Sequence, residues 1–197
     1  FVGGSSEPDT ITVVDTGSGD VTVSVALTAG GTPVSATFNP GDQLIIASGG
    51  GNDVLEVDTS ITTSVNVDLG AGDDSVVAGS GSDILNGGSG NDTINTGGGR
   101  DQIFARDGDD TVHAGAGPDI VHGHGGNDVI LGGPGRDSLD GGDGNDIVLG
   151  GADNDFLRGG NGNDVLSGEH GDDRLLAGTG GNILIGGTGT DYAVGGR

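Results

Sequence analysis

The chain of 197 residues contains no cysteine, methionine, tryptophan or lysine. Without cysteine, neither a disulfide nor a thiolate metal site can form. Four Phe and one Tyr are too few aromatic side chains for an ordinary globular core. No signal peptide and no apolar run of 18 residues is present, so no membrane-spanning helix is predicted. The missing methionine indicates a processed chain or a fragment.

The chain also has very little positive charge. It contains six Arg and 30 acidic residues, which gives a formal net charge of −24. This charge argues against nucleic-acid and anionic-membrane partners. Together with 47 Gly and only 31% hydrophobic residues, it is typical of a disordered chain. A regular repeat overrides that expectation, provided that something neutralises the acidic groups.

Such a repeat is present. The nine-residue unit G-G-x-G-(N/D)-D-x-(V/I/L)-x occurs fourteen times without a break over residues 69–194, for example as GGSGNDTIN at residues 87–95. Position six is Asp in thirteen copies, and position four is Gly in thirteen. A fifteenth copy occupies residues 48–56. The turn preference of Asp explains its presence in each unit, but not one fixed position thirteen times.

The period indicates stacked β-coils. The Gly-rich part cannot hold a helix, whereas x-(V/I/L)-x reads as a short strand with one side chain inward. Two repeats then form one coil of 18 residues, and stacked coils form two facing parallel sheets. We therefore predict an all-β fold, a parallel β-roll or β-solenoid. Its inward residues are Val76, Leu85, Ile94, Ile103, Val112, Val121, Ile130, Leu139, Val148, Leu157, Leu166, Leu175, Leu184 and Ala193.

The N-terminal part is less regular. Residues 10–13, 21–25 and 42–46 read as strands, and we predict that residues 1–47 form irregular coils that lack the Asp turn and cap the roll of residues 48–197. A strand at residues 65–67 would make the stretch from Asp53 to Asp74 one coil of 21 residues.

The repeat resembles the hemolysin-type calcium-binding (RTX) repeat family. The resemblance covers residues 48–56 and 69–194, about two-thirds of the chain. It implies a right-handed β-roll in which each Ca²⁺ lies between turns one coil apart. Carboxylates at position six of both turns bind the ion, and backbone carbonyls complete its shell. Secretion in this family typically depends on a C-terminal signal; none is visible after Val194, so the export route stays open.

Successive repeats alternate sides, so the implied ligands form two columns. One contains Asp53, Asp74, Asp92, Asp110, Asp128, Asp146 and Asp164, followed by Asn182; the other contains Asp83, Asp101, Asp119, Asp137, Asp155, Asp173 and Asp191. Six gaps in each column give about twelve Ca²⁺ ions, whose charge of roughly +24 would cancel that of the chain. Asn182 predicts a weak or empty site beside Asp164.

Four further substitutions depart from the repeat. Arg106, His124 and Glu169 replace Gly at position two, where the backbone carbonyl survives. Asp153 replaces Gly at position four and puts the turn around Asp155 in doubt.

The remaining polar residues give no catalytic pattern. His113, His122, His124 and His170 are interpreted as exposed polar residues, with His113 and His122 on opposite sheets. Neither a G-x-S-x-G nor an H-E-x-x-H motif occurs, so we expect no enzyme activity. Outward positions of one sheet become apolar toward the C-terminus, which fits either ordinary strand propensity or an interface with a partner.

These features predict a secreted, non-enzymatic calcium-binding module that folds on Ca²⁺ binding outside the cell. It would act as a spacer or assembly unit of a bacterial surface layer, matrix or adhesin. Its partners would be calcium ions and either further copies, in a homo-oligomer or head-to-tail assembly, or adjoining domains. The alternative is the C-terminal accessory domain of a secreted protease, lipase or polysaccharide epimerase. Ice or carbohydrate binding ranks lower, because only Thr93 and Thr111 occupy outward Thr positions in the array.

Overall fold

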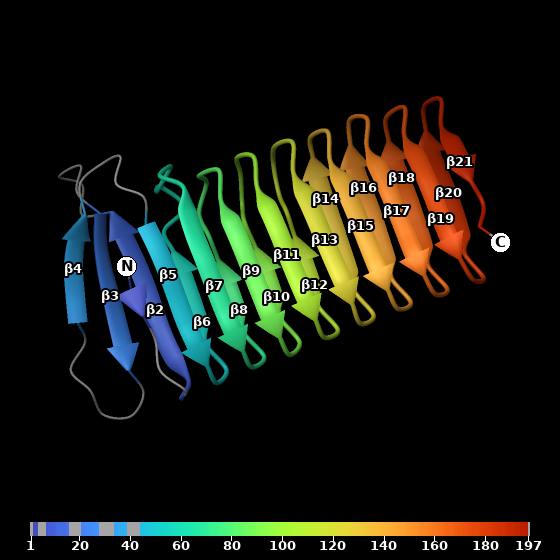
Figure 1. Ribbon diagram of the computed structural model, residues 1–197. Helices are drawn as coiled ribbons and strands as arrows, with labels where there is room; N and C mark the ends of the chain where they lie inside the picture. The colour runs from blue at the N-terminus through green and yellow to red at the C-terminus, as the bar shows by residue number, and fades with distance from the viewer. Residues whose placement is uncertain (1, 4–6, 16–20, 28–33, 39–43, 197) are drawn as a thin grey trace.

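The chain folds into an elongated stack of β-coils (Figure 1). The computed structural model describes residues 2–3, 7–15, 21–27, 34–38 and 44–196, and within these every regular element is a strand. No helix that could span a membrane occurs in this part of the chain.

The strands form two sheets that face each other. The first has ten strands, in the order β1 (Val2–Gly3), β5 (Leu44–Gly50), β7 (Val65–Ala71), β9 (Ile84–Ser89), β11 (Gln102–Asp107), β13 (Ile120–Gly125), β15 (Ser138–Asp143), β17 (Phe156–Asn161), β19 (Arg174–Thr179) and β21 (Tyr192–Val194). The second has eleven, in the order β20 (Ile183–Thr188), β18 (Val165–His170), β16 (Ile147–Ala152), β14 (Val129–Pro134), β12 (Thr111–His113), β10 (Thr93–Asn95), β8 (Ser75–Val77), β6 (Val54–Val57), β2 (Asp9–Asp15), β3 (Val21–Leu27) and β4 (Val34–Phe38).

The pairing confirms the predicted parallel solenoid. Neighbouring strands of the array are parallel and offset by one coil, so that Leu85 pairs with Ile103, and Ile103 with Val121. The coil of 21 residues is also present, since Leu44 pairs with Val65.

Most array strands are longer than predicted. They have six residues instead of three, because the strand continues through the first three positions of the next repeat, as in Ile84–Ser89. The turn is correspondingly short, and only Gly90, Asn91 and Asp92 separate β9 from β10. Each six-residue strand therefore has two inward positions. A large aliphatic residue occupies the first, and a small residue such as Ala105 or Ala177 occupies the second.

The predicted core is confirmed except at its C-terminal end. The inward residues from Val76 to Leu175 are at most 1% exposed. Leu184 is only partly buried, and the prediction for Ala193 is wrong, because this side chain is exposed. Both belong to the last coil, and no later coil of the described chain covers them.

The N-terminal strands combine two kinds of pairing. β1 is parallel to β5 and β2 is parallel to β6, so both extend the coil stack. β3 and β4 instead form an antiparallel meander on β2, and the prediction that residues 21–25 form a further coil is wrong. The predicted strand at residues 42–46 is β5, although residues 42 and 43 lie outside the described residues. β5 also crosses the expected boundary at residues 47 and 48, and that division of the chain stays a prediction.

Candidate metal centre

Each position-six Asp lies at the end of a turn, immediately before the next strand. Asp92 precedes β10, and its backbone N–H donates a hydrogen bond of 2.7 Å to Oδ1 of Asp110, the equivalent residue one coil later. Asp110 donates in the same way to Oδ1 of Asp128 at 2.9 Å. One carboxylate oxygen of each Asp is therefore fixed by the preceding coil, which orients the whole side chain.

This bond repeats along both sides of the stack and brings the predicted residues into two ladders. The first contains Asp53, Asp74, Asp92, Asp110, Asp128, Asp146, Asp164 and Asn182. The second contains Asp83, Asp101, Asp119, Asp137, Asp155, Asp173 and Asp191. Val65 donates the first bond of the second ladder, to Asp83. All fourteen predicted residues are thus in the expected columns, and their role as metal ligands stays a prediction.

The second carboxylate oxygen, Oδ2, is buried and accepts no hydrogen bond within the described structure at thirteen of these fourteen residues. They are Asp53, Asp74, Asp83, Asp92, Asp101, Asp110, Asp119, Asp128, Asp137, Asp146, Asp155, Asp164 and Asp173. Asp191, in the last coil, is only partly buried. A buried carboxylate oxygen without a partner is costly, so thirteen in regular succession require a common explanation.

Backbone carbonyl oxygens lie beside these Oδ2 atoms. The point where a Cβ on Gly132 would stand is 2.5 Å from Oδ2 of Asp137 and 2.6 Å from the carbonyl oxygen of Gly150. Nowhere in the described chain do three His, Asp or Glu side chains converge as metal ligands. Ca²⁺ takes six to eight oxygens, including carbonyls. Carboxylates one coil apart and neighbouring carbonyls therefore fit this ion.

Burial also makes the carboxylates difficult to ionise without a cation. It raises the pKa of Asp83 and Asp146 to about 7 and that of Asp92 to about 6, while the backbone hydrogen bond from the preceding coil opposes the shift. The charges of the neighbouring ladder residues, Asp92 and Asp128, raise the pKa of Asp110 further, after burial, to about 7.

These shifts predict that metal-free protein is more stable in mild acid. The folded-state pKa values lie above the ordinary value of 3.8, so the protonated form is favoured in the folded state. This stabilisation is complete at low pH and is lost as the pH rises through the folded-state values. Without calcium, we expect β-structure measured by circular dichroism to decrease between about pH 4 and about pH 7. A metal-free signal that increases over this range would contradict the burial of the carboxylates.

The four substituted Gly positions keep the geometry of the turn. Arg106, His124 and Glu169 have φ angles of 90°, 76° and 71°, and Asp153 has 77°, so all four adopt the left-handed conformation. This conformation costs roughly 1–2 kcal/mol for a non-glycine residue. Asp155, beside Asp153, is buried and donates the ladder bond to Asp173 at 2.8 Å. The expected disturbance of this turn is therefore absent.

Asn182 keeps the ladder hydrogen bond but lacks the second carboxylate oxygen. Its Oδ1 accepts the N–H of Asp164 at 2.6 Å, as a ladder Asp would. Its Nδ2 replaces the free oxygen and donates to the carbonyl of Thr179 at 3.5 Å. The amide thus places a neutral donor where an Asp would offer a negative oxygen to a cation.

We predict that Asn182→Asp increases the number of bound calcium ions by one, because it completes the gap beside Asp164. Calcium titration by isothermal calorimetry would measure the stoichiometry. Asn163→Asp adds the same charge on the exposed turn surface and should leave the number of ions unchanged. Equal gains in both variants would show that charge alone matters.

Sequence reasoning missed one member of the first ladder. Asp9 is 2% exposed, and its N–H donates to Oδ1 of Asp53 at 2.6 Å, which is the ladder bond one coil before Asp53. The prediction that residues 1–47 lack the Asp turn is therefore wrong. The signal was the order Asp9-Thr10-Ile11, which matches positions six to eight without the preceding glycines.

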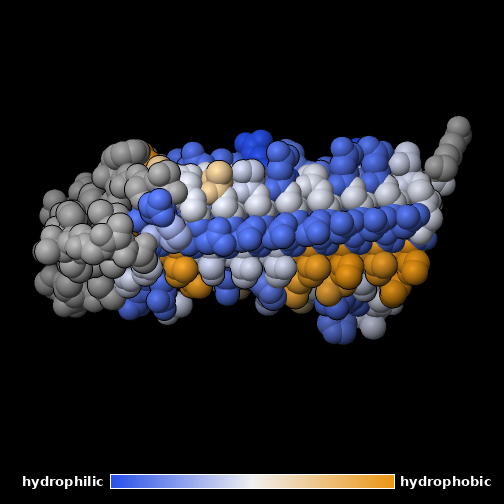
Figure 2. All heavy atoms as spheres, turned by 90° about the horizontal axis from the view of Figure 1, so that it is seen from below, coloured by the Kyte–Doolittle hydropathy of each residue, from blue (hydrophilic) through white to orange (hydrophobic). Residues whose placement is uncertain are grey.

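The role of position five was also missed. On one side of the stack, Asn and Asp at this position form a second, exposed ladder, which runs in the opposite direction. Asn127 donates its N–H to Oδ1 of Asp109 at 2.6 Å, and Asn145 donates to Oδ1 of Asn127 at 2.9 Å. Figure 2 shows hydrophilic residues in a continuous row along this edge. These side chains hold successive turns together outside the buried Asp column.

Comparison with known proteins agrees with this geometry. A search of curated proteins gave no match. The family model described as "RTX calcium-binding nonapeptide repeat (4 copies)" matches residues 68–103, 104–139, 122–157, 140–175, 149–184 and 167–197. These overlapping segments cover residues 68–197, well over half of the chain, and include the array in which the two Asp ladders recur at every coil. The chain therefore belongs to the RTX calcium-binding nonapeptide repeat family.

Proposed function

We propose that this chain is a secreted, non-enzymatic calcium-binding structural module, which folds on Ca²⁺ binding outside the cell. It acts as a spacer or assembly unit in a surface layer, matrix or adhesin. The observation that carries the proposal is the series of thirteen buried Oδ2 atoms without a hydrogen-bond partner in the described structure. A buried series of this kind suits a cation that arrives only after export.

Calcium would supply charge neutralisation and cross-linking between coils. The ladder Asp residues would hold about twelve ions, each between carboxylates of adjacent coils. Because an unfolded chain has no preformed site, the free energy of binding contributes directly to folding. Extracellular calcium modules have dissociation constants of about 10⁻⁴ to 10⁻³ M, well above those of cytosolic calcium sensors. The chain would then stay loose inside the cell and become rigid outside.

The architecture suits a spacer. Ten strands lie side by side in one sheet, which at about 4.8 Å per strand gives a stack roughly 43 Å long. The buried Asp ladders run along both sides of this stack, and the exposed position-five ladder runs along one of them. A calcium-loaded stack would therefore resist bending.

One surface supports the assembly version. The C-terminal stripe, on the outer face of the eleven-stranded sheet, consists of Val129, Leu131, Ile147, Leu149, Val165, Ile183 and Ile185. Ile147, Ile183 and Ile185 are 42%, 56% and 50% exposed. Figure 2 shows hydrophobic residues gathered in a band beside the polar row, toward the C-terminal end. A contiguous exposed apolar patch is typical of an interaction surface.

We predict that the stripe causes self-association of the calcium-loaded protein. Sedimentation velocity should show larger species with increasing protein concentration, and Ile147→Thr with Ile183→Thr should abolish them. Thr is a fitting replacement because Thr93 and Thr111 occupy the same row of this sheet. Ile84→Thr removes an equally exposed Ile from the other sheet and should have no effect. If the parent protein remains monomeric at all concentrations, the assembly role is contradicted and only the spacer role remains.

A further inference from the structure

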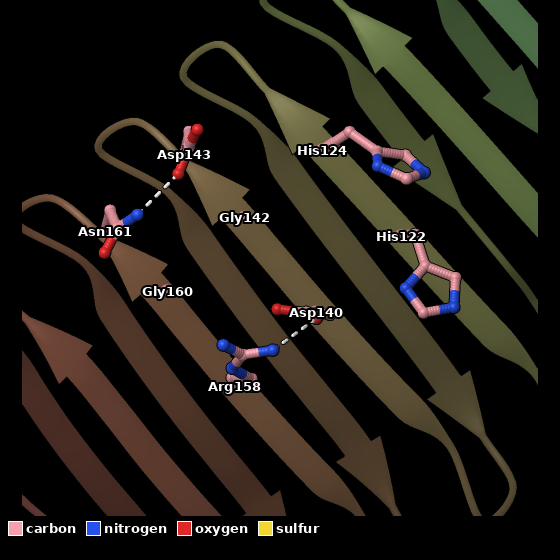
Figure 3. Close-up of a pocket in the computed structure, with 8 residues that line it drawn as sticks. All are labelled: His122, His124, Asp140, Gly142, Asp143, Arg158, Gly160 and Asn161. Atoms are coloured by element: carbon pink, nitrogen blue, oxygen red, sulfur yellow. Dashed lines mark hydrogen bonds and ion pairs between the residues drawn. The ribbon is translucent and has the colours of Figure 1, made fainter.

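Two histidines lie together on the outer face of the ten-stranded sheet, away from both Asp ladders. His122 and His124 are two residues apart on β13, so both side chains project from the same face. Figure 3 shows the two imidazoles above this strand. Their ring centroids are 5.8 Å apart and their planes are inclined by 39°. No motif in the sequence distinguishes this pair from the other two histidines, His113 and His170.

The separation suits two ligands of one ion. A zinc–nitrogen distance of about 2.0–2.1 Å places the metal roughly 3.2 Å from each ring centroid, so two imidazoles on one ion have centroids roughly 5–6 Å apart. Binding of one ion requires that one nitrogen of each ring faces a shared point. We propose that His122 and His124 bind one divalent transition-metal ion of the zinc class, independently of the calcium columns.

A carboxylate lies next to the pair. Asp140 on β15 pairs in register with His122, about 4.8 Å away across the parallel ladder. Its Oδ2 pairs with Nη1 of Arg158 at 3.2 Å, while its Oδ1 is buried without a hydrogen-bond partner in the described structure. Asp140 therefore has one oxygen without a hydrogen-bond partner next to the histidine pair. In the described structure these three side chains do not converge as a ligand set. Water would therefore complete the coordination of an ion held by the two imidazoles.

The surface beside the pair has room for an ion with its water. His122, His124, Asp140 and Arg158 line a depression of about 260 Å³. Gly142 and Gly160, on β15 and β17, also line this depression (Figure 3).

Neighbouring side chains hold the imidazoles in place. Phe104 on β11 stacks on His122 with a centroid separation of 5.4 Å and an angle of 8°. Arg106 lies over the Phe104 ring, and its Nε donates to Oδ1 of Asn86 on β9 at 2.7 Å. The Arg106 guanidinium is thus held toward β9, on the opposite side of the histidine pair from Asp140. Stacking of this kind limits the rotamers of the ring and reduces the ordering cost of binding.

Ligand chemistry separates this site from the columns. Imidazole suits zinc, copper and nickel, whereas oxygen ligands suit calcium. Saturating calcium should therefore fill the Asp columns without displacing a transition metal from the histidine pair.

The test is a Zn²⁺ titration, by calorimetry, of tag-free protein saturated with calcium. We expect one Zn²⁺ per chain. His124→Gly, which restores the residue usual at position two, and His122→Asn, which copies Asn86 in the same row, should each weaken binding at least tenfold. His113→Asn removes an exposed histidine from the opposite sheet and should leave the affinity unchanged. With Cu²⁺ in place of Zn²⁺, electron paramagnetic resonance should show two coupled nitrogens in the parent and one in either pair variant.

Three results would overturn the proposal. One is equal Zn²⁺ affinity in His124→Gly and the parent. Another is a loss of affinity in His113→Asn as large as in the pair variants. The third is no Zn²⁺ binding by calcium-saturated protein, which would show that any binding without calcium belonged to the Asp columns. Because both pair variants keep residues found elsewhere in the same rows, calcium-induced β-structure measures their folding independently of zinc.

Discussion

Removal of calcium at neutral pH is expected to unfold the array. The chain carries a formal charge of −24, and thirteen carboxylate oxygens are buried without a hydrogen-bond partner in the described structure. Without cations, these groups must bind protons or return to water, because an isolated buried charge is very unfavourable. Circular dichroism of metal-free protein should show coil at about pH 7.5, and addition of Ca²⁺ to about 1 mM should produce the β-signal and a compact sedimenting species.

Magnesium provides the control for this experiment. Mg²⁺ has the same charge but requires octahedral geometry and dehydrates reluctantly, so carbonyl-rich sites between coils suit it poorly. At equal ionic strength it should give little β-structure. Equal folding by both ions would mean that general charge screening is sufficient, and a metal-free chain that is already compact and β-structured at neutral pH would make calcium unnecessary for the fold.

The sequence was sufficient for the parts of the fold that repeat. Val121 and Leu139 occupy the same position in repeats two apart, so their burial and their pairing in one sheet follow from the period alone. The two Asp columns follow from the same argument, since a nine-residue period in an 18-residue coil places successive repeats on opposite sides. The hydrogen bond from each Asp N–H to the next carboxylate could not be predicted, because it depends on the conformation of the turn.

The parts that sequence reasoning missed are those without a period. The antiparallel pairing of β3 on β2 depends on connections that carry no repeat signal. Asp9 was missed because its turn lacks the glycines that mark the other turns. The His122–His124 pair could not be predicted, because His124 was expected in a turn, whereas the strand is longer and includes it in β13. In each case, pairing with a neighbouring strand determined the local structure.

Substitution of one ladder residue in the middle of the array should have the largest effect of any single change. Asp128 accepts the N–H of Asp110 at Oδ1 and donates its own N–H to Asp146, both at 2.9 Å. Asp128→Asn would preserve both bonds, as Asn182 shows for the acceptor. It would replace only the buried Oδ2 with an amide donor. The variant therefore isolates the metal-ligand role from the structural role of the side chain.

Because Asp128 lies between two gaps, one shared with Asp110 and one with Asp146, Asp128→Asn should remove up to two calcium ions. At fixed calcium, the free energy of unfolding should decrease by about 3–5 kcal/mol, the range for loss of one partner of a buried ion pair. Asp109→Asn is the matched control, since it removes the same charge from an exposed neighbour at a position where Asn91 and Asn127 occur naturally. Calcium stoichiometry and urea unfolding should separate the two variants. Equal effects would mean that net charge determines stability, whereas a loss confined to Asp128→Asn would identify the buried oxygen as the calcium ligand.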